Sequence, residues 1–252
     1  MADKKNNNQI IDCDVQNETS TINVRAGIEN LKVMMKIDGY TLPTNIAIIA
    51  TTNLTRGVHM SRLVNAAFEN LENKHFTQNM LDILTAVNAT QKEASVRCEF
   101  EYPFKDVFVH IVVLLKNNTF TYMFNAPGIT ACPCSKKMVG IGHMQRAWLS
   151  IAFTQSGQIN INEILEKMFE CFSTTTTEFM KRPQEGQKVL DSQNNPKFVE
   201  DAVRDAAIKF PQAYLIKARS EESIHMHDAV AYISRSTNCP KLTEEECCFF
   251  KI

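Results

Sequence analysis

Residues 106–126 read DVFVHIVVLLKNNTFTYMFNA, two runs of β-branched and aromatic residues joined by Asn117-Asn118. Such residues favour β-strands, and consecutive asparagines tolerate the positive φ angles that a tight hairpin needs. The stretch therefore predicts an antiparallel hairpin near the middle of the chain. Pro127-Gly128 follows directly and is expected to end the second strand.

On either side of this hairpin, strand-like runs alternate with segments of helical spacing. Thr77 is expected to cap one helix, and Asn195-Pro196 to begin the last one. The expected strands are 22–37, 44–55, 95–104, 144–156, 213–220 and 225–234, and the expected helices are 56–76, 77–88, 160–180 and 196–210. Strand pairs that alternate with helix pairs predict an α+β protein with antiparallel sheets, not a parallel dinucleotide-binding fold. The chain has neither a G-x-G-x-x-G motif nor a P-loop.

Composition limits the function classes further. The 252 residues carry 27 Lys and Arg against 28 Asp and Glu, and this balance argues against broad nucleic-acid binding. The polar residues 1–21 predict a flexible N-terminal segment, followed by one domain over residues 22–252. The sequence predicts a cytoplasmic protein with no membrane attachment, because its apolar runs fall short of the ~18 residues a spanning helix needs. The eight cysteines are then expected to be thiols, metal ligands or catalytic groups.

The stretch ACPCSKKMVGIGH, residues 131–143, contains Cys132, Cys134 and His143. Thiolates and imidazoles are common ligands of zinc and ferrous iron. Pro133 is expected to hold the two sulfurs in a rigid turn, not at the helix start that a redox pair usually occupies. A metal site, a redox pair and two buried free thiols all remain open. Because only half of a closed ligand set is present, a metal here would be an open, catalytic one with other ligands from elsewhere.

Two more clusters contain ionisable groups. Residues 220–229, SEESIHMHDA, hold two histidines that would share one face of a strand, or would lie in a solvated polar loop. Arg56, His59 and Arg62 lie where a strand leads into a helix, an arrangement that suits phosphate but also fits a surface basic cluster. Glu200 alone is best explained as one half of an exposed ion pair with Arg204.

Seven motifs together resemble one family, GTP cyclohydrolase I type B. They are DVQN (14–17), LTRGVHMSR (54–62), PGITACPCSK (127–136), GHMQR (142–146), KRPQEG (181–186), NPKFVEDAVRD (195–205) and ESIHMHDAVAYI (222–233). They follow the order of the family and span nearly the whole chain. The chain departs from the pattern in one residue fewer between Cys132 and His143, in Gln184 where an acidic residue is expected, and in a shorter segment before Glu222.

The resemblance implies a tunnelling fold, in which antiparallel strand pairs and helix pairs assemble into barrels, with two tandem modules in residues 22–252. It implies a homotetramer with active sites at subunit interfaces. The implied reaction converts GTP and water to 7,8-dihydroneopterin triphosphate and formate. The implied cofactor is one divalent metal per site, either zinc, manganese or iron.

The resemblance also assigns roles to single residues. The implied metal ligands are Cys132, His143, Glu185 and His225, and the implied catalytic residues are Cys132, His143, Glu222 and His225. Glu200 would bind the guanine edge, which displaces the ion-pair explanation. Candidates for the triphosphate are Arg56, His59, Arg62, Lys136 and Arg146. Cys134 remains ambiguous, and the other cysteines are expected to be structural or incidental.

Three alternatives remain beside this interpretation. An archaeal-type relative would form 7,8-dihydroneopterin 2′,3′-cyclic phosphate with ferrous iron. A tunnelling-fold nitrile reductase would use a cysteine nucleophile and a nicotinamide cofactor. A nucleotide-binding module without catalysis would bind GTP and release no formate.

Overall fold

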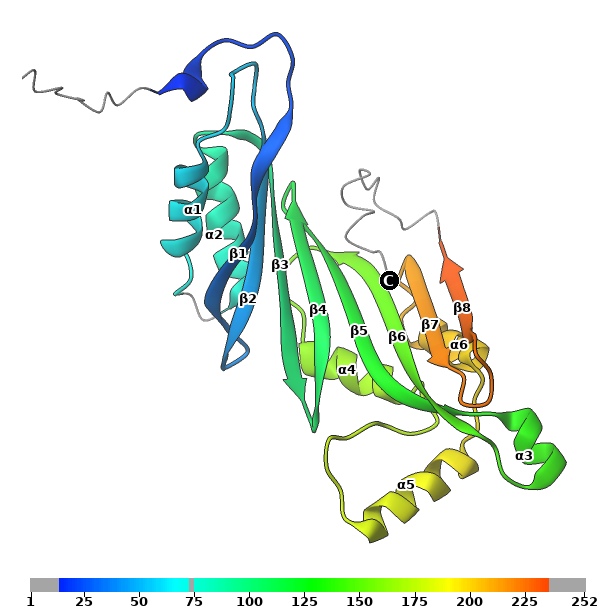
Figure 1. Ribbon diagram of the computed structural model, residues 1–252. Helices are drawn as coiled ribbons and strands as arrows, with labels where there is room; N and C mark the ends of the chain where they lie inside the picture. The colour runs from blue at the N-terminus through cyan, green and yellow to red at the C-terminus, as the bar shows by residue number, and fades with distance from the viewer. Residues whose placement is uncertain (1–13, 73–74, 236–252) are drawn as a thin grey trace, which may run out of the picture.

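The computed structural model describes residues 14–72 and 75–235, and their centre is one eight-stranded antiparallel sheet (Figure 1). The strands follow the chain from one edge to the other. They are β1 (Arg25–Ile37), β2 (Tyr40–Thr51), β3 (Lys92–Phe104), β4 (Val107–Lys116), β5 (Thr119–Ala131), β6 (Met144–Gln155), β7 (Leu215–Glu221) and β8 (Asp228–Ser234). The prediction of an α+β protein with antiparallel strands is confirmed.

Six α-helices accompany the sheet in the described residues. They are α1 (Met60–Phe68), α2 (Phe76–Asn88), α3 (Pro133–Val139), α4 (Ile161–Phe169), α5 (Arg182–Asn194) and α6 (Val199–Lys209). Apolar side chains of α1, α2, α4 and α6 join one face of the sheet in a single core, as every second strand residue points to that face. A small second cluster with Val112, Met123, Ala152 and Tyr214 lies on the opposite face. None of the described helices is both long and apolar enough to cross a membrane.

The central hairpin forms as the sequence predicts. Asn117 and Asn118 have φ angles of 49° and 58°, and Lys116 pairs with Thr119 across the turn. The expected end of the strand at Pro127-Gly128 is wrong. Strand β5 pairs with β4 up to Asn125 and continues along β6 to Ala131, so the strand reaches the Cys132 segment without a break.

Two expected helix starts are also wrong. Helix α2 begins at Phe76 after His75, and Thr77 is buried inside its first turn. Asn195-Pro196 does not start α6, because Lys197 first donates its backbone N–H to the carbonyl of Ala131 and bridges to the end of β5. The helix then starts at Val199, where Asp201 Oδ2 accepts the N–H of Phe198 at 3.0 Å.

Residues 14–21 lie against the segment that precedes α1. Thr19 forms a bridge with Thr55, and Glu18 Oε2 lies 2.6 Å from Arg56 Nη1. The expected flexible segment therefore has contacts in its described part, while residues 1–13 lie outside the described residues. The domain boundary at residue 21 stays a prediction.

Candidate functional site

The Cys132 segment folds into a closed loop between β5 and β6. Cys132 is the N-cap of α3, with Pro133 at the first helical position, so the expected turn away from a helix start is wrong. Its Sγ accepts the N–H of Ser135 at 3.4 Å, and its own N–H donates to the carbonyl of His143 at 2.9 Å. A Cβ on Gly142 would lie 2.6 Å from the Cys132 carbonyl oxygen, so only glycine allows this close approach. The loop thus brings Cys132 and His143 together.

A cavity of about 280 Å³ lies beside this loop, at the N-terminal end of α6. Five of the side chains that the sequence singled out line it: Cys132, His143, Glu200, Glu222 and His225. They come from the α3 loop, the first turn of α6 and the loop between β7 and β8. The fold therefore gathers a thiol, imidazoles and carboxylates from segments far apart in the sequence.

Hydrogen bonds fix several of these groups. His143 Nδ1 lies 2.9 Å from Gln145 Oε1, 3.4 Å from Ser223 Oγ and 4.0 Å from Glu222 Oε2. Ser220 is fully buried and donates its hydroxyl to Glu222 Oε1 at 2.6 Å. One oxygen of Glu222 is thus tied to the sheet, while the other faces His143.

His225 and His227 do not lie in a strand, because β8 begins only at Asp228. Their rings stack in the preceding loop with centroids 5.0 Å apart and planes 12° apart. Both line the same cavity. The expectation that the two histidines point to one side therefore holds, although they lie in a loop and not in a strand.

The donor types in this cavity suit a divalent metal ion. Thiolate, imidazole and carboxylate are the ligand types that zinc and its neighbours take, and Cys132, His143, His225 and Glu222 supply them. Within residues 14–72 and 75–235, no three such side chains already stand close enough together to hold an ion. Two other thiols are unsuited, because burial raises the pKa of Cys98 and of Cys171 to about 12.

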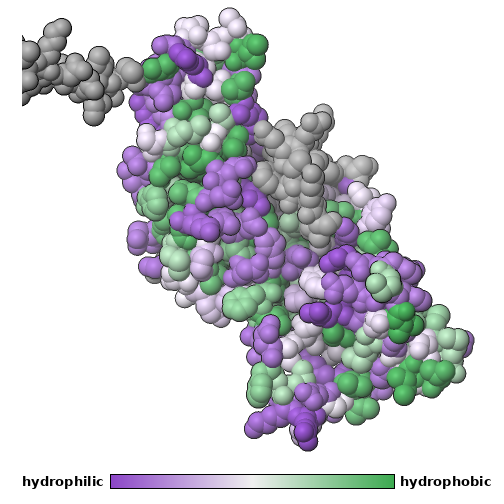
Figure 2. Space-filling view, viewed as in Figure 1, coloured by the Kyte–Doolittle hydropathy of each residue, from purple (hydrophilic) through white to green (hydrophobic). Residues whose placement is uncertain are grey.

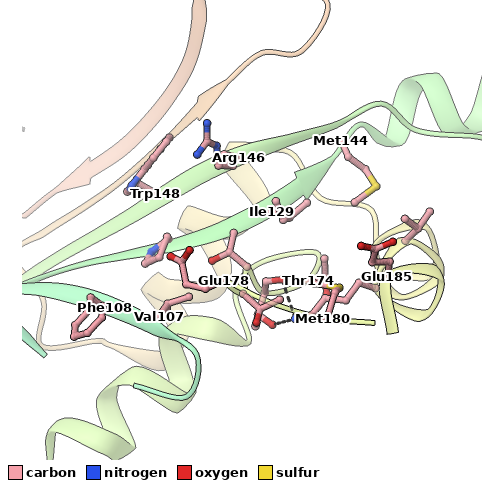
Figure 3. Close-up of a pocket in the computed structure, with 16 residues that line it drawn as sticks. Val107, Phe108, Ile129, Met144, Arg146, Trp148, Thr174, Glu178, Met180 and Glu185 are labelled. Carbon is pink, nitrogen blue, oxygen red and sulfur yellow. Dashed lines mark hydrogen bonds between the residues drawn. The ribbon is translucent and has the colours of Figure 1, made fainter. Parts of the chain in front are cut away.

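Glu185 and Arg146 line a different cavity of about 550 Å³ (Figure 3). Glu185 comes from α5 and lies beside Met144, whereas Arg146 and Trp148 project from β6. Alternate residues of a strand point to opposite faces, so this cavity and the one lined by Gln145 lie on opposite faces of the sheet. The fold does not bring Glu185 together with Cys132.

The remaining phosphate candidates lie apart from the cavity. Arg56 pairs with Glu18, and His59 and Arg62 line a small cavity of about 200 Å³ next to α1. Figure 1 places α1 and α3 at opposite ends of the molecule. Lys136, by contrast, lies on α3 within one turn of Cys132.

Sequence reasoning missed two groups beside His143, Gln145 and Ser223. Gln145 received no role, although it stands two residues after His143 and so can project to the same side. Ser223 was passed over as part of a polar loop. Both residues stand within two positions of a residue that the sequence did single out, His143 or Glu222. This spacing predicts a contact only once His143 and Glu222 are known to lie close together.

The fold and this cavity define an α+β protein with a polar site of thiol, imidazole and carboxylate groups beside an antiparallel sheet. Among known families, the one described as type I GTP cyclohydrolase folE2 matches residues 13–231, and the chain belongs to this family.

Curated relatives agree with this assignment. The chain is 33% identical to the GTP cyclohydrolase FolE2 of Thermotoga neapolitana over 254 residues, which cover 88% of this chain and 96% of the relative. It is 31% identical to that of Thermotoga maritima over the same shares of both chains. The GTP cyclohydrolase FolE2 of Herminiimonas arsenicoxydans is 30% identical over 74% of this chain and 80% of its own length.

Proposed function

We propose that this chain is a GTP cyclohydrolase that converts GTP and water to 7,8-dihydroneopterin triphosphate and formate. The observation that supports this most directly is the convergence of Cys132, His143, Glu200, Glu222 and His225 on one cavity. Family membership points to the same activity, because the relatives carry the name GTP cyclohydrolase.

Glu200 is suited to hold the guanine ring. The N1–H and 2-amino groups of guanine are two donors in one plane, and a carboxylate offers two acceptors in one plane. Glu200 lies in the first turn of α6 and lines the cavity, so a ring bound to it would extend toward Cys132 and His143.

Glu222 is suited to move protons during ring opening. Water must attack C8 of the purine, and N7 must gain a proton as its double bond to C8 becomes a single bond; the C8–N9 bond then breaks, and N9 takes the proton of the new C8 hydroxyl. Because Ser220 holds Oε1, we propose that Oε2 accepts a proton from the attacking water and returns it to N7.

We propose Cys132, His143 and His225 as ligands of one divalent ion, either zinc, manganese or iron. When bound, such an ion lowers the pKa of a coordinated water from ~16 to ~7 and so makes it reactive at neutral pH. We propose that Glu185 joins this set through a change in the position of α5 or from another subunit, since within one chain it lies on the other face of the sheet.

We propose that the triphosphate is bound by residues of two subunits. Lys136 belongs to the cavity end of the molecule, and Arg146 projects from β6 on the face opposite to Gln145. Arg56, His59 and Arg62 lie beside α1, so they would reach the triphosphate from another copy of the chain in a homotetramer. The order of two strands, helices and two strands in each half is compatible with two tandem tunnelling-fold modules.

The decisive experiment removes metal with a chelator and adds back single divalent ions together with GTP. We expect formate and a pterin that fluoresces after oxidation, with at least one ion restoring activity. Cys132→Ala and His143→Ala should both abolish turnover, whereas His75→Gln, an exposed histidine outside the cavity, should keep it. Turnover that needs no metal, or that survives Cys132→Ala, would contradict the proposal.

The same assay separates the alternatives. A cyclic phosphate product identifies the archaeal-type reaction. Consumption of a nicotinamide cofactor with a deazapurine nitrile identifies a reductase, and GTP binding without formate identifies a binding module.

A further inference from the structure

The Nδ1 atom of His143 is surrounded by groups that can accept a hydrogen bond. The amide oxygen of Gln145 is nearest at 2.9 Å, the hydroxyl of Ser223 follows at 3.4 Å, and a carboxylate oxygen of Glu222 lies at 4.0 Å. A carboxylate can only accept, an amide oxygen can only accept, and a hydroxyl can do either. This environment favours the neutral tautomer with the proton on Nδ1.

The tautomer decides which nitrogen of the ring can bind a metal. A neutral imidazole with hydrogen on Nδ1 presents its lone pair on Nε2. Metal-binding histidines usually donate their other ring N–H to a carboxylate or carbonyl oxygen, which fixes the ring orientation as well.

Gln145 is well placed to hold its side chain still. Only 8% of the residue is exposed, and it pairs with Thr130 in the register between β5 and β6. Ala147 and Leu149, the next β6 residues on the same face, are buried in the core, so the amide projects from a well-packed strand toward His143.

We propose that Gln145 is a positioning residue, whose Oε1 accepts the Nδ1–H of His143 and thereby reserves Nε2 for the divalent ion. This inference rests on the proposed function, because it assigns Gln145 a role in metal binding. In this role Gln145 acts through His143.

The first test measures the tautomer without metal. Nitrogen NMR of the metal-free protein, labelled with ¹⁵N-histidine, distinguishes Nδ1–H from Nε2–H rings above about pH 8, where free imidazoles are neutral. His143 is assigned by the loss of its signals in His143→Asn. Wild type and Gln145→Glu should show the Nδ1–H form, because both supply a near acceptor oxygen. Gln145→Met should weaken this preference, because only the more distant oxygens of Ser223 and Glu222 remain.

The second test measures zinc affinity by competition with a chromophoric chelator. Gln145→Met should weaken zinc binding about 10- to 100-fold, the usual effect of removing such a partner. Gln145→Glu should retain the affinity. Gln155→Met, at the exposed end of the same strand, is the matched control and should match wild type.

Two results would overturn the inference. One is an Nε2–H ring in wild type, and the other is a Gln145→Glu protein that binds zinc as weakly as Gln145→Met while both unfold at the wild-type temperature. If wild type binds no divalent ion at all, the proposed function fails, and an Nδ1–H ring that depends on Gln145 would still verify the hydrogen bond itself.

Discussion

At the scale of single residues, Gly128 has no room for a side chain. It lies in β5 against the ring of Phe172, and a Cβ built there would be 2.2–2.4 Å from three ring carbons. Phe172 is itself buried, so it has little room to move. Gly128→Ala should therefore lower the free energy of unfolding by about 1–3 kcal/mol, as overpacking of a core does. Urea denaturation measures this change.

Gly186 supplies the matched control for that substitution. It lies on the exposed helix α5, and its added Cβ would meet no described atom within 4 Å. Alanine stabilises a helix by up to about 1 kcal/mol relative to glycine. Gly186→Ala should thus leave stability unchanged or raise it. Equal losses in both variants would show that the Phe172 contact is not the cause.

At the scale of elements, the pairing of β3 with β4 carries an ionisable contact. His110 faces Glu101 across the two strands, with Nδ1 2.9 Å from Oε1, and Glu99 lies 3.3 Å from Nε2. The hydrogen bond to Glu101 is the main cause that raises the pKa of His110, while burial and Arg97 oppose it. Protonated His110 therefore stabilises the folded sheet.

This gives a pH dependence with a definite sign. Because the pKa of His110 is raised in the folded state, protonated His110 stabilises the fold fully below the ordinary imidazole pKa of ~6.5. This stabilisation is lost as the pH rises through the raised pKa. The destabilisation caused by His110→Gln should be larger at pH 6 than at pH 9, by a few tenths to about 1 kcal/mol. Urea unfolding of both proteins at the two pH values measures it. In a Glu101→Gln background the pH-dependent difference should shrink, and an undiminished difference would rule out this contact.

The elements also show what the sequence could predict. Runs of β-branched and aromatic residues located most strands, and the paired asparagines located the central turn, because both signals are local. The start of α6 was predicted too early, since Lys197 is held by Ala131, a contact far away in the chain. Helix α5 was missed because it has little apolar face of its own; Ser192 is its only buried residue among those described.

The sequence predicted those site residues whose side-chain type and motif already indicate their chemistry. Cys132, His143, Glu200, Glu222 and His225 were chosen from motifs, and they do line one cavity. Glu185 was grouped with them, yet it lies on the opposite face of the sheet. Which face a residue occupies depends on the paths of β6 and α5, and spacing in the sequence does not encode those paths.

At the scale of the whole molecule, the candidate residues lie at two separate ends. The thiol and imidazole cavity lies near α3 and the start of α6, while Arg56, His59 and Arg62 lie near α1 (Figure 1).

Figure 2 shows apolar side chains gathered where α3 lies, and Met138, Val139 and Ile141 are exposed there. Strand β8 also forms an edge of the sheet in the described residues. Both features suit contact with another copy of the chain.

This separation leads to a test of shared sites. If each site takes Cys132 from one copy and Arg62 from another, the two variants Cys132→Ala and Arg62→Ala are each inactive for a different reason. In a random 1:1 assembly, about one site in four would then combine two intact surfaces. Co-expressed variants should therefore recover roughly a quarter of wild-type formate production per site, and light scattering should give four times the 28.6 kDa chain.

The control for this test pairs two variants of the same surface. Cys132→Ala mixed with His143→Ala should stay inactive, because both residues line one cavity in one chain and every site would lack one of them. Recovery in this control would mean that the two residues come from different copies. Failure of Cys132→Ala with Arg62→Ala to recover, in a mixed tetramer verified by mass spectrometry, would place the triphosphate cations within one subunit. Because Arg62 and the Cys132 cavity lie at opposite ends of the chain, that outcome would assign Arg62 to the structure around Asp14, which lies 4.0 Å from its guanidinium.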